Sequence, residues 1–243
     1  MNDTEKISKL QEMIDSTTNI CVFTGAGISC PSGIPDFRSA NGIYNEKTNT
    51  TYSPEQMISH SFFVQRPEMF YDFYKNKMMY LDAKPNDAHL YFAGLEKKGK
   101  KVSVVTQNID GLHQAAGSTD VIELHGSIHR NYCMSCGKFY DAAYVKNYDG
   151  VPKCECGGTI KPDVVLYEEP LDENATMKAI DKIASAETMI IIGTSLIVYP
   201  AASYVRYFRG SNLVLLNKSS TAYDNSADLA IYDDVVNVVH KLK

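Results

Sequence analysis

The sequence TGAGISCPSGIPDFRS, residues 24–39, follows an apolar run at residues 19–23 and opens with two glycines one residue apart. A buried strand followed by Gly-x-Gly is typical of a βα turn that binds a pyrophosphate. The first glycine allows the tight turn, and the second leaves room for a phosphate. Because Cys30 replaces the third glycine of the full fingerprint, a plain tight turn after a buried strand is an equally good reading of the glycines alone. The carboxylate, aromatic ring and guanidinium of residues 36–38 favour a nucleotide site over packed core.

The overall composition describes an ordinary globular protein. Its 243 residues can bury one sizeable core with a small second module, and its net charge of −5 argues against a nucleic-acid surface. The acidic balance suits a basic substrate such as a lysine-bearing peptide. The charged N-terminus lacks the apolar core of a signal peptide, and small and polar residues interrupt the longest apolar stretch, residues 189–202. We therefore expect a cytoplasmic protein that neither binds nucleic acid nor spans a membrane.

Four of the six cysteines are paired by their spacing. Two residues separate Cys133 from Cys136, and after a gap of 17 residues a single residue separates Cys154 from Cys156. Two turns that each present two thiolates are typical of a tetrahedral zinc site, and this reading is favoured over four unrelated thiols. Four cysteines leave no open coordination position, so we expect one structural Zn²⁺.

Hydrophobic periodicity predicts alternating helices and strands. The expected helices have an apolar face at helical spacing: residues 3–16, 86–99, about 172–186, and a last one from about 233. Asp3 or Thr4 is expected to cap the first of them. The expected strands after the first are short and apolar: residues 101–106, 121–124, 188–192 and 213–216. Two segments break this order, the aromatic-rich helical pieces before residue 85 and the cysteine segment, and both are interpreted as insertions in one sheet domain.

Polar residues gather where two of the predicted strands end. Residues 107–113, QNIDGLH, follow the strand at 101–106, and open α/β sheets place their ligands at the carboxyl ends of strands. His125 follows the strand at 121–124 and precedes a glycine. It is the best candidate for a general base, because an ordinary imidazole titrates near pH 6.5.

The other polar residues have simpler interpretations. Asp36, Asn108 and Asp110 could each cap a turn, but their position at the strand ends of one nucleotide fold favours a site. Four histidines are interpreted as non-catalytic. His60 and His240 are expected on the surface, and His89 and His113 are interpreted as structural.

Several motifs in order carry a resemblance over residues 7–239: GAGIS, SGIPDFRS, TQNIDGLH, LHG at 124–126, the four cysteines and GTSLIVYPA. Together they resemble the sirtuin family of NAD-dependent protein deacylases, and compact bacterial-type members above all. The resemblance implies a Rossmann-like doubly wound parallel sheet and a smaller domain made of a helical module and a zinc module. NAD and an acyl-lysine peptide would meet in the cleft between these domains. The implied boundaries are 1–39, 85–128 and 161–243 for the NAD-binding domain, 40–84 for the helical module and 129–160 for the zinc module.

The resemblance also assigns binding residues by their position in the motifs. Those of the dinucleotide turn and the loop after it are Gly25, Ala26, Gly27, Cys30, Asp36, Phe37 and Arg38. Those around the nicotinamide and its ribose are Gln107, Asn108, Ile109, Asp110 and His125. Those for the phosphates, the adenosine ribose and the adenine are Gly193, Thr194, Ser195, Asn217, Lys218 and Asp234. The substrate backbone would be clamped as an added strand by Val164, Val165, Leu166, Tyr167, Ile197, Val198 and Tyr199.

The implied reaction needs a dry and oriented pocket, because the amide oxygen of acyl-lysine attacks only a strongly ionised sugar. Asn108 and Asp110 would orient the ribose and the nicotinamide carboxamide, and His125 would deprotonate a ribose hydroxyl. The products would be lysine, nicotinamide and acylated ADP-ribose. An ADP-ribosyltransferase or NAD glycohydrolase, and a zinc-bearing module that senses ADP-ribose without turnover, are the alternatives. The presence of a candidate base argues against the sensor.

The chain departs from the family pattern at three positions that bear on its contacts. Cys30 stands where relatives often have Thr, and Glu168 where they often have Gly. Members that prefer acidic acyl groups carry a Tyr and an Arg three residues apart, and here Tyr74 and Lys77 occupy those positions. Lys lacks the planar fork with which Arg binds a carboxylate, so we expect a deacetylase that accepts neutral acyl chains and handles succinyl-lysine poorly.

Overall fold

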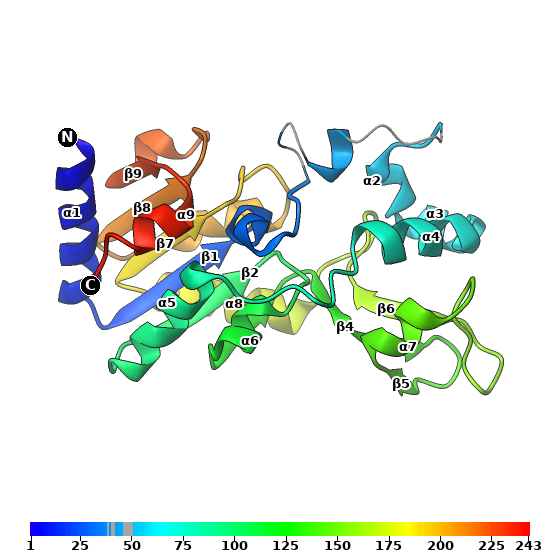
Figure 1. Cartoon of the computed structure of the whole chain (residues 1–243). Helices are drawn as coiled ribbons and strands as arrows, with labels where there is room; N and C mark the ends of the chain where they lie inside the picture. Colours follow the sequence, from blue (N-terminus) through cyan, green and yellow to red (C-terminus); the bar gives the residue numbers. More distant parts are fainter. Residues whose placement is uncertain (38, 40–41, 46–50) are drawn as a thin grey trace.

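The computed structural model of the chain describes residues 1–37, 39, 42–45 and 51–243. Among these residues a parallel sheet of six strands forms the centre, in the order β3-β2-β1-β7-β8-β9 (Figure 1). Its strands are β1 (Asn19–Thr24), β2 (Lys101–Thr106), β3 (Asp120–Glu123), β7 (Thr188–Ile192), β8 (Asn212–Asn217) and β9 (Leu229–Tyr232). The sheet grows from β1 in one direction and then, from β7, in the other, which is the Rossmann order with its switch point between β1 and β7. The predicted doubly wound α/β class is therefore confirmed.

Helices cover both faces of this sheet. One face carries α1 (Asp3–Ser16), α5 (Asp87–Lys97) and α9 (Val235–Val239), and the other carries α8 (Glu173–Ser185) and η4 (Ala201–Tyr207). Successive strand residues point to opposite faces, so Val22 packs in the first core and its neighbours Cys21 and Phe23 pack in the second. Both faces are thereby removed from water, which explains the continuously apolar strands.

Three details of this domain differ from the sequence expectation. The cap of α1 is Asn2, one residue before the expected Asp3, and it forms a capping box with Glu5. The helix α6 (Leu112–Ala116) and the strand β9 were not expected, because short elements leave too few apolar positions to establish a period. The first βα turn continues as two 3₁₀ turns, η1 (Ala26–Ile28) and η2 (Cys30–Ser32), and a further one, η5 (Asp224–Ser226), precedes β9.

The smaller domain lies at the right of Figure 1 and combines both insertions. Its antiparallel sheet has the order β5-β4-β6, with β4 (Gly126–Cys133), β5 (Phe139–Tyr140) and β6 (Ile160–Val164). Its helices are η3 (Ile43–Asn45), α2 (Pro54–Met57), α3 (His60–Gln65), α4 (Pro67–Lys77) and α7 (Ala142–Asn147). Phe70 and Tyr74 of α4, Val145 of α7 and Ile160 of β6 are buried in one shared aromatic cluster.

Two lysines link the two insertions reciprocally. Lys75 of α4 donates to the carbonyl oxygens of Tyr148 and Gly150, at 2.5 and 2.7 Å, just beyond the end of α7. Lys146 of α7 donates in return to the carbonyl oxygens of Lys75 and Met79 at the end of α4. Each ammonium thus neutralises the negative end of the other lysine's helix, which is a favourable arrangement. The helical and zinc modules therefore form one packed unit.

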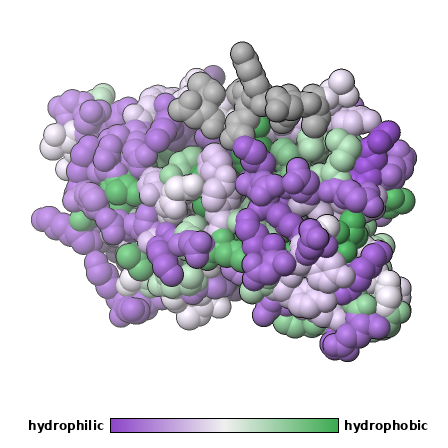
Figure 2. Space-filling view, turned by 45° about the vertical axis from the view of Figure 1, so that its right-hand side comes forward, coloured by the Kyte–Doolittle hydropathy of each residue, from purple (hydrophilic) through white to green (hydrophobic). Residues whose placement is uncertain are grey.

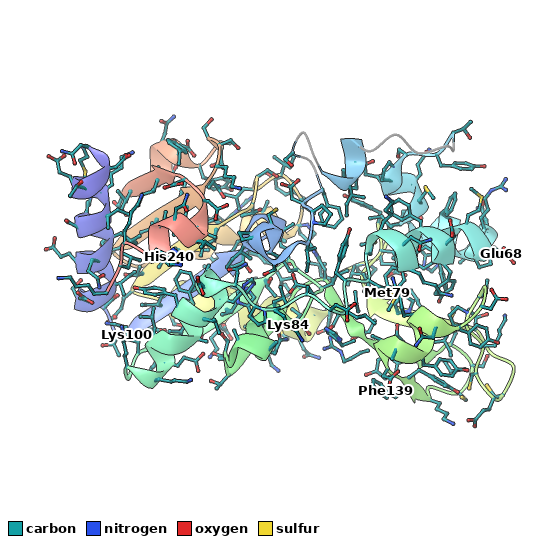
Figure 3. All side chains as sticks on the ribbon, viewed as in Figure 1. Glu68, Met79, Lys84, Lys100, Phe139 and His240 are labelled. Atoms are coloured by element: carbon teal, nitrogen blue, oxygen red, sulfur yellow. The ribbon has the colours of Figure 1, made fainter. Side chains whose placement is uncertain are left out.

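The surface is predominantly polar. Hydrophilic side chains cover most of the face seen in Figure 2, and apolar ones lie between them in small groups. Lys100 and His240 extend from the sheet domain, whereas Glu68 and Phe139 extend from the smaller domain (Figure 3). Within the described ranges, none of the helices combines the length and the apolar character needed to cross a bilayer.

Candidate active site

The switch point of the sheet brings two small-residue turns into contact. The Gly25 N–H donates to the carbonyl oxygen of Ile192 at 3.0 Å, and the Gly27 N–H donates to that of Gly193 at 2.9 Å. A Cβ atom added at Gly27 would lie 2.6 Å from the Gly193 Cα, so any side chain there would push the turns apart. The Gly-x-Gly pattern predicts that this glycine leaves room for a phosphate. In the structure the packing of one turn on the other already requires it.

The loop that follows β2, residues 107–111, is fixed against the first turn. Asn108 is buried, and its amide donates to the Gly25 carbonyl oxygen at 3.1 Å and to the Ser29 Oγ at 3.2 Å. The Asp110 carboxylate accepts from the Ser29 hydroxyl at 2.7 Å and from the Leu112 N–H at 2.9 Å. Burial raises the pKa of Asp110, and these two hydrogen bonds oppose the rise. An amide and a carboxylate are therefore held in place at the carboxyl end of β2.

His125 lies directly before β4, between the large sheet and the small one (Figure 1). Its Nδ1 is 2.9 Å from the carbonyl oxygen of Gln107, and a carbonyl can only accept, so the proton of the neutral ring sits on Nδ1. Nε2 then carries the lone pair. Burial lowers the pKa of His125 below its ordinary value of 6.5. The ring is therefore a neutral base at pH 7, in the protonation state that a general base requires.

The residues predicted for the phosphates and the adenosine gather at the carboxyl ends of β7, β8 and β9. The Asn217 amide exchanges two hydrogen bonds with the backbone of Thr194, at 3.0 and 3.1 Å. The Lys218 Nζ lies 2.8 Å from the Asp234 carboxylate, which also caps α9. Ser195 follows on the exposed side of the turn. The structure thus brings these residues together beside the first turn.

The predicted residues of the loop after the first turn are partly described. The Cys30 Sγ lies 3.6 Å from the Ala26 carbonyl oxygen and 3.8 Å from the Asp36 carboxylate. Burial raises the pKa of the Cys30 thiol, which therefore stays protonated and acts as a weak donor. The Phe37 ring packs against the Tyr44 ring with centroids 5.3 Å apart. Arg38 lies outside the described residues.

The predicted peptide clamp consists of two segments. In the first, Val164 ends β6, Leu166 is buried, and the Val165 N–H donates to the His125 carbonyl oxygen at 3.0 Å. Tyr167 forms a parallel bridge with Ser59, which ties this segment to the helical module. In the second, Ile197 and Tyr199 are 55% and 67% exposed, and Val198 between them is half-buried. The exposed apolar side chains of the second segment suit contact with a peptide.

Glu168 explains how the chain manages without the glycine common at that position. Its φ of 76° is in the left-handed region, which costs free energy for a residue with a side chain. Its carboxylate accepts from the backbone N–H and from the hydroxyl of Ser61, at 2.9 and 2.6 Å, in the first turn of α3. These bonds offset the strain and anchor the clamp segment to the helical module.

The four paired cysteines converge as predicted, with all four Sγ atoms within 4.8 Å of one another. Sγ separations of 3.5 Å between Cys133 and Cys156 and 3.6 Å between Cys136 and Cys154 are close to the about 3.8 Å edge of a tetrahedron with Zn–S bonds of about 2.3 Å. The Tyr140 hydroxyl donates to the Cys154 Sγ at 3.1 Å and orients that ligand. The site fits a structural Zn²⁺.

Comparison with known proteins places this arrangement in a family. The model of the Sir2 family matches residues 25–200. The chain belongs to the Sir2 family. An NAD-dependent protein deacetylase of Clostridium perfringens is 59% identical over 98% of both chains, and one of Clostridium acetobutylicum is 54% identical over 97% of both.

Solved Sir2 structures have the same fold. A Sir2 complex with a deacetylated p53 peptide and 3′-O-acetyl-ADP-ribose superposes with a TM-score of 0.87 at 40% identity, covering 97% of this chain and 96% of that one. A Sir2–p53 peptide–NAD⁺ complex gives 0.84 at 39% identity, with the same coverage. The resemblance deduced from the motifs is therefore confirmed.

The described residues of this Sir2 chain fit NAD. Two glycine-containing turns meet at the switch point, where such folds bind dinucleotides, and the neighbouring Thr194, Asn217 and Lys218 carry donors suited to phosphate and hydroxyl groups. The sequence argument missed Ser29, although it lies within the GAGIS motif. Its fully buried hydroxyl bonds to both Asn108 and Asp110 and so belongs to this hydrogen-bonded cluster, and a serine between a buried strand and a proline was the available signal.

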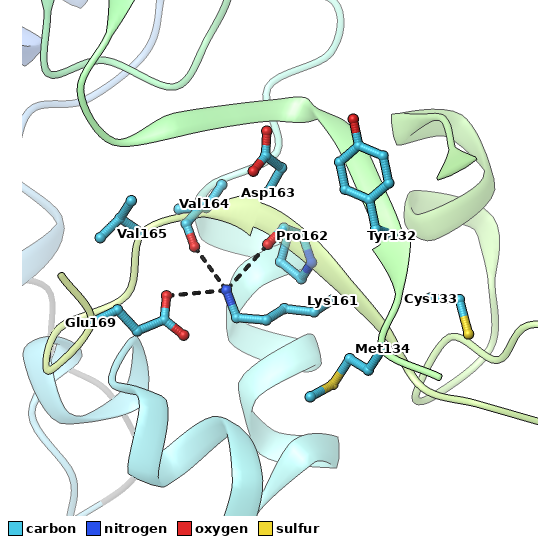
Figure 4. Close-up of a pocket in the computed structure, with 9 residues that line it drawn as sticks. All are labelled: Tyr132, Cys133, Met134, Lys161, Pro162, Asp163, Val164, Val165 and Glu169. Atoms are coloured by element: carbon cyan, nitrogen blue, oxygen red, sulfur yellow. Dashed lines mark hydrogen bonds and ion pairs between the residues drawn. The ribbon is translucent and has the colours of Figure 1, made fainter. Parts of the chain in front are cut away.

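A separate cavity of about 300 Å³ lies outside β6 in this Sir2 chain (Figure 4). Lys161 crosses it and donates to the carbonyl oxygens of Pro162 and Val164 and to the Glu169 carboxylate, at 3.4, 3.1 and 3.1 Å. The ammonium thereby covers outward-facing carbonyls of an edge strand, a common protection against strand addition. The lining includes Val164 and Val165 of the clamp but no residue of the glycine turns or of the loop at 107–111, so this cavity is not the candidate active site.

Proposed function

We propose that the chain is an NAD-dependent protein deacetylase, which transfers the acetyl group of an acetyl-lysine peptide to ADP-ribose and releases nicotinamide. The observation that carries this proposal is His125, a neutral imidazole with its lone pair on Nε2, which is held by the Gln107 carbonyl oxygen at the carboxyl end of β2. A base in that state can accept a proton from a ribose hydroxyl. Relatives that share 54 to 59% of its residues bear the same activity in their names, which favours deacetylation over ADP-ribosyl transfer to protein.

Asn108 and Asp110 orient the ribose and the nicotinamide carboxamide in this proposal. NAD, when bound, supplies the electrophilic sugar carbon. The amide of Asn108 and the carboxylate of Asp110 are both tied to Ser29, so they meet the ligand without reorganising, and preorganised groups are the more effective in catalysis. Ile109 and Gln107 complete the loop around the nicotinamide. Phe37 shields the sugar from water after nicotinamide leaves.

The remaining contacts to NAD come from the two turns and the strand ends. Residues 25–27 and Gly193 cradle the pyrophosphate together with Thr194 and Ser195, and Cys30, Asp36 and Arg38 line the adjoining loop. Asn217, Lys218 and Asp234 hold the adenosine. Their position at the switch point supports this assignment.

The acetyl-lysine peptide enters between the two clamp segments. Residues 164–167 and 197–199 bind its backbone as an added strand, a mode that tolerates many sequences. His125 and the first clamp segment are joined by the bond from the Val165 N–H to the His125 carbonyl oxygen, so the bound peptide lies next to the base. Solved relatives hold an acetylated and a propionylated peptide, which supports a site for short neutral acyl groups.

The proposal also includes the location and the domain boundaries. A cytoplasmic location suits the site, because reducing conditions keep the cysteines available to zinc. We place the NAD-binding domain at 1–39, 85–128 and 161–243, the helical module at 40–84 and the zinc module at 129–160. With these boundaries β4 crosses from one domain to the other, and β6 after Ile160 is counted with the NAD-binding domain although it pairs with β4 in the small sheet.

The decisive experiment is substitution of His125 with product analysis. His125→Ala is expected to lower deacetylation by about 10²–10⁴-fold, the usual contribution of a general base, and to leave NAD affinity within about twofold. Mass spectrometry of the wild-type reaction is expected to show acetyl-ADP-ribose. His240→Ala, which removes an exposed histidine paired with Asp87, is the matched control. Near-normal turnover in a folded His125→Ala protein, or ADP-ribosylated protein as the wild-type product, would contradict the proposal.

A further inference from the structure

One strand carries the smaller domain into contact with the loop at residues 107–111. β4 starts at Gly126, next to His125, and pairs with β6 in the smaller domain (Figure 1). Its register with β6 shifts between Ser127 and Asn131, so residues 128–130 bulge out of the pairing. We call residues 128–130 the β4 bulge. Bulges of this kind re-aim side chains, and they are frequent next to active sites.

The β4 bulge is hydrogen-bonded to the loop rather than to its own sheet. The Ile128 N–H donates to the Ile109 carbonyl oxygen at 3.0 Å. The His129 Nε2 lies 2.9 Å from the Asp110 carbonyl oxygen, which can only accept, so Nε2 is the protonated nitrogen. A Cβ atom added at Gly111 would lie 2.8 Å from the His129 ring, so the ring lies directly against that glycine. A side chain of the smaller domain thus fixes the peptide between Asp110 and Gly111.

His129 and Ser29 hold Asp110 at opposite ends of the residue. Ser29 and the Leu112 N–H bind its carboxylate, whereas His129 binds its carbonyl oxygen. Gly111 follows with a φ of 72°, and a glycine permits many other backbone angles. Without the bond from His129, the peptide after Asp110 loses its fixed orientation, and the carboxylate follows it.

Arg130 braces the β4 bulge from the other side. Its Nη1 lies 2.7 Å from the carboxylate of Glu123 at the end of β3, and its Nε lies 2.7 Å from that of Asp163 in β6. The guanidinium therefore joins the large sheet to the small one, and the two carboxylates raise the pKa of Arg130 against the lowering effect of burial. The β4 bulge is thus bound to the loop at residues 107–111 on one side and to Glu123 and Asp163 on the other, so the His129 side chain keeps one position.

We propose that His129 is a positioning residue of the deacetylation reaction, which holds Asp110 for the nicotinamide from the smaller domain. The inference rests on the proposed function of Asp110. It predicts that loss of His129 weakens the binding of nicotinamide and NAD but not of the acetyl peptide, because the hydrogen bond of the His129 side chain among the described residues goes to Asp110 and not to the peptide clamp.

The test compares His129→Ala with His129→Gln, whose side-chain amide can replace the Nε2 donor. His129→Ala is expected to raise the inhibition constant of nicotinamide and the KM for NAD about fivefold, which is about 1 kcal/mol at 1.4 kcal/mol per tenfold. The KM for an acetyl peptide should stay within twofold, and His129→Gln should restore all three values to within twofold. His240→Ala, which changes an exposed residue of the sheet domain (Figure 3), is expected to change none of them.

A double-mutant cycle shows whether His129 acts through Asp110. NAD binding is measured by calorimetry, which needs no turnover, in the Asp110→Asn background with and without His129→Ala. We expect the second substitution to change the Kd less than twofold there. An equal fivefold effect in both backgrounds, a failure of Gln to restore binding, or a wild-type nicotinamide constant in His129→Ala would overturn the inference. A wild-type protein that forms no acetyl-ADP-ribose would overturn the proposed function instead, and the calorimetric cycle would still test His129.

Discussion

Two buried histidines, one in α5 and one in α6, should make the stability of the fold depend strongly on pH. His89 and His113 are 0% and 1% exposed, and their ring centroids are 4.8 Å apart. Burial lowers the pKa of His89 to about 4, and burial together with the charge of His89 lowers that of His113 to about 3. Both rings are therefore neutral in the folded protein at every pH above 5.

The magnitude follows from the difference between the folded and unfolded states. An unfolded histidine has a pKa of about 6.5, so between that value and pH 3–4 the unfolded chain binds more protons than the folded one, and the free energy of unfolding falls as the pH falls. Between pH 7 and pH 5 each histidine contributes a loss of about 2 kcal/mol, and the two together about 4 kcal/mol. This is a large part of the stability of an ordinary domain.

The substitution His113→Gln isolates one of these contributions. Gln can keep a hydrogen bond to the Thr24 hydroxyl, which lies 3.1 Å from the His113 Nε2, but it does not titrate. Urea unfolding of wild type and variant at pH 7 and pH 5 is expected to show that the variant loses about 2 kcal/mol less than wild type. Carboxylates and the zinc site contribute equally to both proteins and cancel in this comparison. A double difference below about 0.5 kcal/mol would refute the reasoning.

Three further predictions concern catalysis and the metal. Burial lowers the pKa of His125, so the fall of kcat/KM on the acid side should have its midpoint below pH 6.5. A midpoint at or above pH 6.5 would contradict the assignment of His125 as the base. Cys133→Ser should lower both the zinc content and the melting temperature, since binding energy at such a site is folding energy, and a fully active protein without zinc would exclude a structural role. On one peptide, acetyl- and butyryl-lysine should be better substrates than succinyl-lysine; a succinyl preference abolished by Lys77→Ala would show that this lysine binds carboxylates.

Local patterns in the sequence predicted the sheet domain well. The buried strand and glycine turn at residues 19–27 and the helix starting at Asn86 depend on neighbours in the chain, and both form as expected. The cysteine spacing predicted the metal site for the same reason, because each pair lies within one turn. The arrangement at the switch point was predictable only in outline, since the contact between Gly27 and Gly193 joins turns that lie far apart in the sequence.

The contacts of the smaller domain could not be read from the sequence. The β4 bulge depends on how β4 and β6 align, and no local signal in residues 128–130 encodes that register. His129 has no motif around it, so it escaped the list of candidates, as did Ser29. The caps show a smaller error of the same kind: Asn2 and Asp3 are both good capping residues, and only the backbone decides between them.

The core shared by α4 and β6 affects how the chain folds during its synthesis. The Tyr71 hydroxyl donates to the Ile160 carbonyl oxygen, across 89 positions of sequence. At a synthesis rate of about 5–20 residues per second, the ribosome needs roughly 4–18 s after it has synthesised Tyr71 of α4 to reach Ile160 of β6. During that interval β4, β5 and β6 have not yet been synthesised, so Phe70 and its aromatic neighbours cannot bury their side chains against the small sheet. A nascent chain stalled near residue 125 would therefore expose these aromatic side chains to solvent. We expect chaperones to bind the chain while this hydrophobic surface is exposed.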